Sequence, residues 1–256
     1  MKGVDPARAR AKPYSYDERK LVEHMKSLPV IPSLLFIVGY IVIKYLRSAG
    51  LVPDSFSPIP IIETAWLPFL IVIGIIIWMR MQKIPLSRVG LFRFPLSRSL
   101  FILVIVVFTI DFLSVALTTA ALGSFFGEAE QVARFQALPG NLPLLLLILP
   151  LSWVFVFGEE FFFRGFLLTT LAENLGGSRV AWLVAVFIQG VAFGLIHLEQ
   201  GPLQVINIGV GGVVFGAVFL YTRKNPKRGG LWPLIIVHGI TNTLGFVLLF
   251  SGAIVR

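Results

Sequence analysis

The chain has 256 residues and a net charge of +9; 56% of its residues are hydrophobic and only 14% are charged. A soluble domain has about a quarter of its residues charged, and a chain of this size cannot bury so much apolar surface in a core. The composition therefore excludes a soluble domain, and it excludes a disordered chain for the same reason. Because the sequence has no cysteine, it offers no disulfide, no thiolate metal ligand and no cysteine nucleophile.

The first 28 residues are polar and mixed in charge, and we predict that they form a cytoplasmic tail. Residues 29–256 are predicted to form one transmembrane domain, in which apolar runs of membrane-spanning length recur. About 20 helical residues are needed to cross a bilayer. This length places spans near Val30–Arg47, Ile59–Met79, Leu100–Ala121, Leu142–Leu171, Val180–Leu198, Val205–Tyr221 and Leu231–Ala253.

The fourth of these runs is too long for one straight crossing. Pro143 and Pro150 lie near its start and predict a kinked or broken helix. An eighth membrane element could lie there, or near Gly201 and Pro202, where the apolar pattern is interrupted. The predicted fold is therefore an all-α, polytopic membrane helix bundle with seven to eight transmembrane helices.

The positions of the basic residues explain the net charge. With seven spans and the amino terminus in the cytoplasm, 17 of the 22 Lys and Arg residues fall on the inside, whereas Arg164 lies within a span. This distribution follows the positive-inside rule, so we expect the lipid bilayer, and no nucleic acid, as the partner of this chain. The outside connection from Leu122 to Asn141 is predicted to carry a short helix on the membrane surface.

Ionisable side chains inside a span are costly unless they are paired or hydrated, and so they mark functional sites. Glu160 and Arg164 are four residues apart and can pair on one helix face. Glu159 points about 100° away from Glu160 and is predicted to lack a local cation. In non-polar surroundings such a carboxylate accepts a proton readily, which suits a general base. Asp111 stands alone in the third span and is expected either to pair with Arg164 or to line a wet cavity.

Two histidines and an amide accompany these charges. His197 ends its apolar run, and His238 and Asn242 are four residues apart on one stripe. A carboxylate and an imidazole can deprotonate water, while a second imidazole and a carboxamide can stabilise an oxyanion, so the set favours hydrolysis. Glu159, His197 and His238 could alternatively bind Zn²⁺. Straight counting places these side chains at different depths, so tilt or a helix break has to bring them together.

Three motifs stand in order along the chain: Glu159-Glu160-x-x-x-Arg164, Phe193-x-x-x-His197 and His238-x-x-x-Asn242. Together they resemble the CPBP family, which joins the Ras-converting CAAX prenyl endopeptidases to the bacteriocin-processing and self-immunity proteins of the Abi type. The resemblance covers residues 142–250, the motif-bearing core of the predicted protease domain. It implies a multi-pass intramembrane endopeptidase. We expect it in the cell membrane of a bacterium or archaeon, with its amino terminus in the cytoplasm as the charge distribution predicts.

The resemblance also implies a role for each motif residue. It makes Glu159 the water-activating base with His197 as its partner, His238 and Asn242 the oxyanion stabilisers, and Glu160 and Arg164 a supporting pair. The expected mechanism uses no cofactor, with Zn²⁺ on Glu159, His197 and His238 as the alternative.

The expected substrate is a peptide or protein, either a prenylated CAAX carboxyl terminus or a bacterial peptide precursor. A non-catalytic immunity or scaffold protein of the same fold is the main alternative. A transporter or proton relay is the third class, and the lack of an inverted repeat in the sequence disfavours it. No oligomeric state is predicted.

Overall fold

The computed structural model describes residues 30–48, 60–126, 135 and 137–253. Within these ranges the chain forms helices and no strand, which confirms the all-α prediction. The predicted cytoplasmic tail, and residues 127–134 of the connection that is predicted to carry a surface helix, lie outside the described residues. In chain order the elements are α2 (Val30–Ser48), α3 (Pro60–Met81), η2 (Leu86–Val89), α4 (Arg98–Phe126), α6 (Leu142–Glu159), η3 (Glu160–Leu167), α7 (Leu168–Asn174), α8 (Arg179–Leu195), η4 (Leu198–Gln200), α9 (Pro202–Thr222), η5 (Pro226–Arg228) and α10 (Trp232–Phe250).

Helical structure lies at each of the seven predicted span ranges, with ends that differ by a few residues. In the described part of the chain, four helical stretches are long and apolar enough to cross a membrane. These are Arg98–Phe126, Leu142–Asn174, Pro202–Thr222 and Pro226–Phe250. Helix α8 has 17 residues and is shorter than the usual crossing length. Long apolar helices of this kind are typical of an integral membrane protein.

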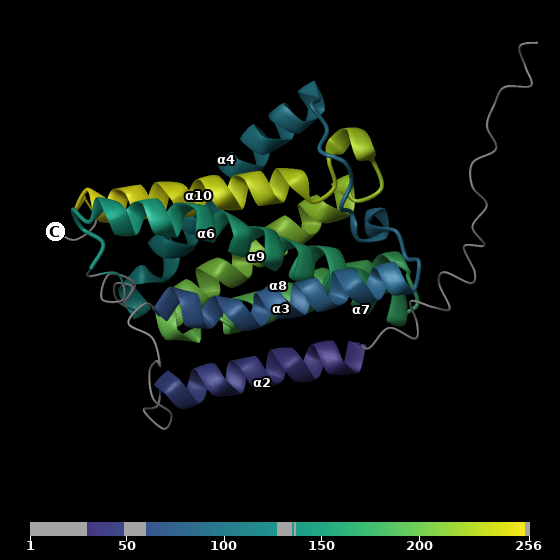
Figure 1. The fold of residues 1–256 in the computed structure, drawn as a ribbon, viewed down its shortest axis with the longest axis horizontal. Helices are drawn as coiled ribbons and strands as arrows, with labels where there is room; N and C mark the ends of the chain where they lie inside the picture. Colours follow the sequence, from purple (N-terminus) through teal and green to yellow (C-terminus); the bar gives the residue numbers. More distant parts are fainter. Residues whose placement is uncertain (1–29, 49–59, 127–134, 136, 254–256) are drawn as a thin grey trace, which may run out of the picture.

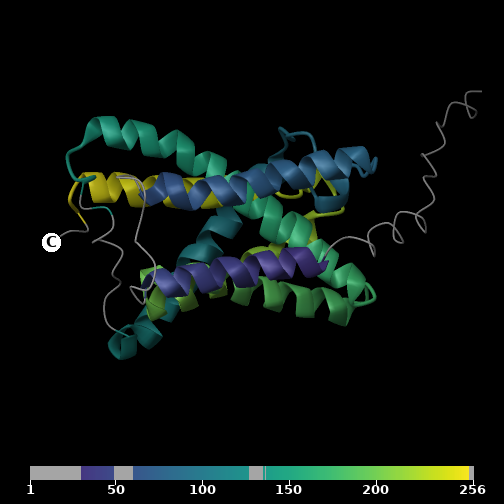
Figure 2. The same ribbon diagram turned by 60° about the horizontal axis from the view of Figure 1, so that its bottom comes forward.

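The helices form one bundle with α9 at its middle. Figure 1 shows α6 and α10 side by side, with α4 crossing behind them, and Figure 2 shows the same crossing from another direction. Helix α9 packs against both α8 and α4, and α4 also packs against α10. Helix α2 lies at the edge, where it contacts α7 and η4. The carboxyl-terminal helices therefore form the centre of the molecule.

The fourth predicted run is one continuous helical stretch and does not break at its prolines. Pro143 lies in the first turn of α6, where its missing N–H is not needed, and Asn141 caps this end by accepting a hydrogen bond from the Leu144 N–H at 3.2 Å. Pro150 lies inside α6, which continues past it. The irregularity falls later, in η3, which is a π-helix of eight residues joined directly to α7. No separate helix interrupts this stretch, nor does one precede α9 beyond the three-residue η4.

Glycines let α8 and α9 approach each other closely, as their four-residue spacing in both helices suggests. A Cβ on Gly194 would lie 2.5 Å from the Val205 carbonyl oxygen, and one on Gly212 would lie 2.9 Å from the Cα of Gly190. These distances leave no room for a side chain at either position. The two helices therefore touch through their backbones, which fixes the position of the chain that follows α8.

The amino-terminal helices are tied to the later ones at the end that is predicted to be cytoplasmic. The indole N–H of Trp232, at the start of α10, donates a hydrogen bond of 2.9 Å to the carbonyl oxygen of Phe92 in the connection between η2 and α4. Arg88 in η2 forms an ion pair of 2.7 Å with Glu173 in α7. These contacts join segments that lie 85 or more residues apart in the sequence.

Candidate active site

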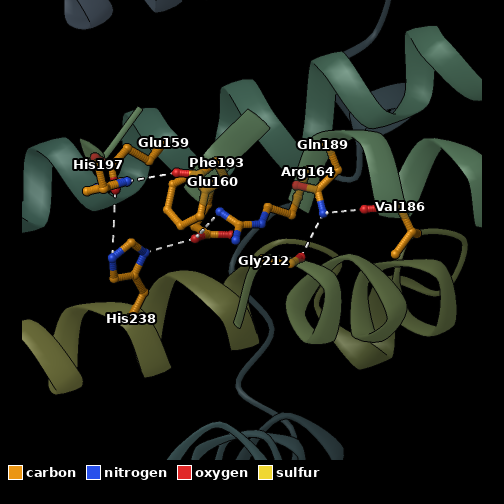
Figure 3. Close-up of polar contacts among 9 residues, drawn as sticks. All are labelled: Glu159, Glu160, Arg164, Val186, Gln189, Phe193, His197, Gly212 and His238. Atoms are coloured by element: carbon orange, nitrogen blue, oxygen red, sulfur yellow. Dashed lines mark hydrogen bonds and ion pairs between the residues drawn. The ribbon is translucent and has the colours of Figure 1, made fainter. Parts of the chain in front are cut away.

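The predicted site residues come from three parts of the fold. The junction of α6 and η3 carries the two glutamates and the arginine, the chain just after α8 carries the first histidine, and α10 carries the second histidine and the asparagine. Figure 3 shows that Glu159, His197 and His238 lie at the same end of this cluster, while Glu160 and Arg164 continue it toward α8.

Glu160 and Arg164 form the buried part of the cluster. Arg164 Nη1 lies 3.0 Å from Glu160 Oε1, and the two side chains are 1% and 0% exposed. This confirms the pairing that their spacing predicts. Both residues belong to η3, in which every residue from Glu160 to Leu167 is buried. Short π-helical segments are rare and occur frequently at functional sites.

Aromatic rings enclose the Arg164 guanidinium. Its Cζ lies 4.1 Å from the centroid of the Phe193 ring and 5.4 Å from that of Phe215. A cation over an aromatic face is attracted by the ring quadrupole, an effect of about 2 kcal/mol when the pair is out of water. The ion pair and the two rings together allow a full positive charge to lie in a non-polar interior.

His238 connects the buried pair to the second glutamate. Its Nδ1 lies 2.9 Å from Glu160 Oε1, and its Nε2 lies 3.7 Å from Glu159 Oε2. A protonated imidazole donates from both nitrogens, so a ring placed between two carboxylates is well suited to the cationic form. The Phe193 and Phe215 rings meet this imidazole edge-on, each with centroids 6.2 Å apart from it.

Glu159 differs from its prediction in two respects. The sequence predicts a carboxylate without a local cation in non-polar surroundings, but the structure places His238 within ion-pair distance when that imidazole is protonated. The Glu159 side chain is also 27% exposed. The spacing rule considers only neighbours on the same helix, whereas His238 arrives from α10. Glu159 therefore has a partner on another helix and a side chain that is partly exposed.

His197 lies just after α8, which ends at Leu195. Its Nδ1 lies 2.8 Å from the carbonyl oxygen of Phe193. Because a carbonyl only accepts hydrogen bonds, Nδ1 carries the proton in this contact. The imidazole also packs edge-on against the Phe193 ring, with centroids 5.1 Å apart. His197 and His238 thus rest on the same phenylalanine ring.

Asn242 lies one turn after His238 on α10 and is half-buried. Its carboxamide forms no hydrogen bond with the part of the chain that the structure describes. The neighbouring position Gly239 accommodates the Trp153 ring of α6, which a Cβ would meet at 2.5 Å. The Trp153 indole N–H also donates a hydrogen bond of 3.1 Å to Thr243 Oγ1. These contacts hold α10 against α6 and so fix the position of His238 along the helix axis, beside the glutamates.

The alternative zinc ligands, Glu159, His197 and His238, come from three separate segments. Across the described residues, no group of three or more His, Cys, Asp or Glu side chains is arranged to hold a metal ion. His238 directs its two nitrogens toward Glu160 and Glu159, and His197 uses Nδ1 for the Phe193 carbonyl. Metal-bound and purely hydrogen-bonded histidines both hold Nδ1 against a carbonyl or carboxylate oxygen in this way.

Sequence reasoning assigned no role to the aromatic residues of this site. Phe193 and His197 are four residues apart, a spacing that brings two side chains together on a helix, so their contact was open to prediction. Phe215 and Trp153 reach the site from other helices, and nothing in their local sequence distinguishes them from ordinary packing residues.

Comparison with known proteins agrees with the motif resemblance. Residues 141–244 match the family model described as type II CAAX prenyl endopeptidase, Rce1-like. The matched range includes all six predicted site residues and excludes α2, α3 and α4. Searches of the curated proteins and of the solved structures found no match.

Proposed function

We propose, from the Rce1-like domain at residues 141–244, that this chain is an intramembrane endopeptidase acting near the carboxyl terminus of prenylated, CAAX-type proteins. The observation that carries the proposal is the meeting of a partly exposed carboxylate with two imidazoles from separate segments. Glu159 lies 3.7 Å from His238, and His197 packs on the same Phe193 ring as His238. Groups of this kind activate water for hydrolysis.

Glu159 acts as the general base in this proposal. It removes a proton from a water molecule that it holds together with His197, and the resulting hydroxide attacks the scissile carbonyl carbon. The C–N bond then breaks, and Glu159 returns the proton to the leaving amine. The exposure of the Glu159 side chain supports this role, because the attacking water has to reach it.

His238 and Asn242 stabilise the oxyanion that forms on the carbonyl oxygen. The donor on His238 is its Nε2–H, because the 3.7 Å between Nε2 and Glu159 Oε2 is longer than a hydrogen bond. Hydrogen-bond donors that are already in place contribute most to such steps. The carboxamide of Asn242 is half-buried and makes no hydrogen bond to described residues, so its N–H groups are available to a substrate carbonyl. Glu160 supports His238 through Nδ1, and Arg164 supports Glu160. The proposed reaction uses no metal or other cofactor.

We also propose seven membrane crossings, formed by α2, α3, α4, the joined stretch α6–η3–α7, α8, α9 and α10. The helices at all seven predicted ranges support this number. With the amino terminus in the cytoplasm, only Lys44, Arg47, Arg134 and Arg256 among the Lys and Arg residues lie outside. That distribution supports the orientation.

The test uses the purified full chain in detergent with two substrates, a farnesylated CAAX peptide and an unprenylated leader peptide. We expect the wild type to cleave the farnesylated peptide and Glu159→Gln to lose activity by a factor of about 10²–10⁴, the usual contribution of a general base. Glu18→Gln, in the polar tail, is the matched control and should cleave at the wild-type rate.

The thermal midpoint of Glu159→Gln should stay close to that of the wild type, which separates lost catalysis from lost folding. Full activity of Glu159→Gln would disprove the assignment of the base. Cleavage of the leader peptide but not of the farnesylated peptide would show that the substrate is a peptide precursor and not a prenylated protein. Complete loss of activity with a chelator, reversed by zinc, would show that the enzyme depends on zinc and would disprove the metal-free mechanism.

A further inference from the structure

Helix α4, which lies outside the range matched by the protease family, has an inward face that changes from apolar to polar along its length. In its first half the buried residues are Leu100 and Val107. From position 111 to position 118, the residues that are not exposed are Asp111, Ser114 and Thr118. Their spacing of three and four residues places them on one stripe of the helix. Every residue between these positions is apolar and exposed, so this half of α4 turns its polar side chains toward the bundle.

Asp111 stands at the inner end of this stripe. It follows Arg98, the first residue of α4, by 13 residues, which is about 20 Å along the helix. A carboxylate at this depth is costly unless it is paired or hydrated. The sequence allows an ion pair with Arg164, but that guanidinium pairs with Glu160. Among the described residues Asp111 forms neither an ion pair nor a hydrogen bond, and its side chain is only half-buried. Water is therefore the partner that can stabilise its charge.

Helix α9 faces this stripe with an amide and a glycine. Asn207 is 3% exposed, and its Nδ2 donates a hydrogen bond of 3.1 Å to Thr119 Oγ1. Its Oδ1 is buried and accepts no hydrogen bond from the part of the chain that the structure describes. Water molecules commonly satisfy buried oxygens of this kind where other polar groups are near. One turn further along α9, Gly211 leaves space beside Asp111, whose Oδ1 lies 3.4 Å from the position that a Cβ would take.

The polar seam, as we name it, consists of Asp111, Ser114, Thr118, Thr119 and Asn207. Its outer end approaches the side of the membrane opposite the cytoplasm in the proposed topology. Thr119 stands seven residues before Phe126, the last residue of α4, which is about 10 Å along the helix.

The inner end of the polar seam lies next to the candidate site. Phe215 is one turn after Gly211 and so shares its face of α9. The centroid of the Phe215 ring lies 6.2 Å from that of His238. Helix α4 also packs against α10, the helix that carries His238. Polar groups therefore extend from the outer part of α4 to the aromatic wall of the site.

We propose that the polar seam is hydrated in the membrane and brings water from the outer side of the bilayer toward the endopeptidase site. Hydrolysis consumes a water molecule for each peptide bond that it breaks, and a site enclosed by apolar helices needs a route for that water. Polar and ionisable residues that face the interior of a membrane bundle commonly line such routes. The supply of water rests on the proposed function, whereas the hydration of the seam does not.

The test uses the absence of cysteine from the chain, because a single introduced thiol then reports its surroundings without a background. Ser114→Cys and Thr118→Cys place a thiol in the polar seam, and Leu113→Cys and Leu117→Cys are the matched controls on the exposed apolar face at nearly the same depth. Intact cells that express the full chain are treated with a charged methanethiosulfonate, which cannot cross the membrane. We expect each seam thiol to react about tenfold faster than its control or more, since the reactive thiolate forms in water and not in hydrocarbon.

Equal rates at the seam and control positions, or no reaction at either seam position, would disprove the hydration. Reaction in inverted membrane vesicles but not in intact cells would disprove the opening to the outer side. The Ser114 and Thr118 hydroxyls bond to carbonyl oxygens of their own helix, so the thermal midpoints of both seam variants should stay near that of the wild type.

Peptide cleavage tests the supply of water separately. Purified Thr118→Cys that has been labelled carries an added group in the seam, and we expect it to lose most of its cleavage of the farnesylated peptide. Leu117→Cys treated in the same way should keep its rate. An unchanged rate in labelled Thr118→Cys would disprove the supply of water through the seam. A wild type that cleaves neither peptide would defeat the proposed function, and the labelling rates would still decide whether the seam is hydrated.

Discussion

The polar cluster has a closed side and an open side, and two adjacent glutamates belong to different sides. The closed side consists of Glu160 and Arg164, which are fully buried, paired and covered by aromatic rings. The open side consists of Glu159, His197 and Asn242, which are partly exposed. Burial therefore separates two uses of the same chemical group. A closed carboxylate can hold a histidine in place, while an open one can meet water and substrate.

The strongest test of this comparison is the stability of variants at the two glutamates. Glu160→Gln leaves the Arg164 guanidinium buried without its counter-charge, and we expect a loss of about 3–5 kcal/mol in the free energy of unfolding. Glu159→Gln, on the open side, should lose less than about 1 kcal/mol. Thermal or denaturant unfolding in detergent measures both losses.

A double variant tests whether the loss in Glu160→Gln comes from the unpaired charge of Arg164. Because Glu160→Gln combined with Arg164→Met removes both buried charges, it should be more stable than Glu160→Gln alone. If the two glutamate variants were equally stable, the division into a closed and an open side would be wrong.

A smaller effect is expected where α8 touches α9. Gly194→Ala places a Cβ 2.5 Å from the Val205 carbonyl oxygen, and such overpacking costs about 1–3 kcal/mol. Because Gly194 is three residues before His197, the shift should also lower peptide cleavage. Gly74→Ala in α3 is the control, since a Cβ there would meet nothing within 4 Å. Equal behaviour of the two variants would show that the close contact is unimportant.

The smallest effect is expected at the ring that joins the two sides. Phe193→Leu removes the aromatic face beneath Arg164 and the edge contacts to both histidines, and we expect a loss of about 1–2 kcal/mol. Phe187→Leu, on the same helix but 63% exposed, controls for the loss of ring area. The rate of peptide cleavage and the free energy of unfolding should fall for Phe193→Leu and stay near the wild-type values for Phe187→Leu. Equal losses in both variants would assign the effect to α8 as a whole.

Much of the fold could be predicted because a bilayer imposes a simple length rule. The apolar runs at Leu100–Ala121 and Val205–Tyr221 correspond to α4 and α9, which extend only a few residues further at each end. The prolines predicted a kinked or broken helix for the fourth run, and the helix is not broken at either of them. Pro150 lies inside a helix that packs against α10, and the π-helix that follows has no signal in the sequence that a helical period would reveal.

The site could be predicted where its contacts are local along a helix. Glu160 and Arg164 pair as their spacing indicates. The contact between His238 and Glu159 joins residues 79 positions apart, so only the packing of α10 on α6 determines it. Counting residues places His197 at a different depth in the membrane from the other site residues. Its actual position depends on packing, because α8 ends at Leu195 and the chain turns there.

The π-helix makes the site unusually sensitive to the number of residues in the helical segment that carries it. Deleting one residue between Phe161 and Arg164 would shorten the stretch by only about 1.5 Å, which a membrane span tolerates. The same deletion would rotate everything downstream by about 100°, and Glu173 in α7 would then turn away from Arg88. Codon insertions and deletions here are therefore far more damaging than the length of the span alone would suggest.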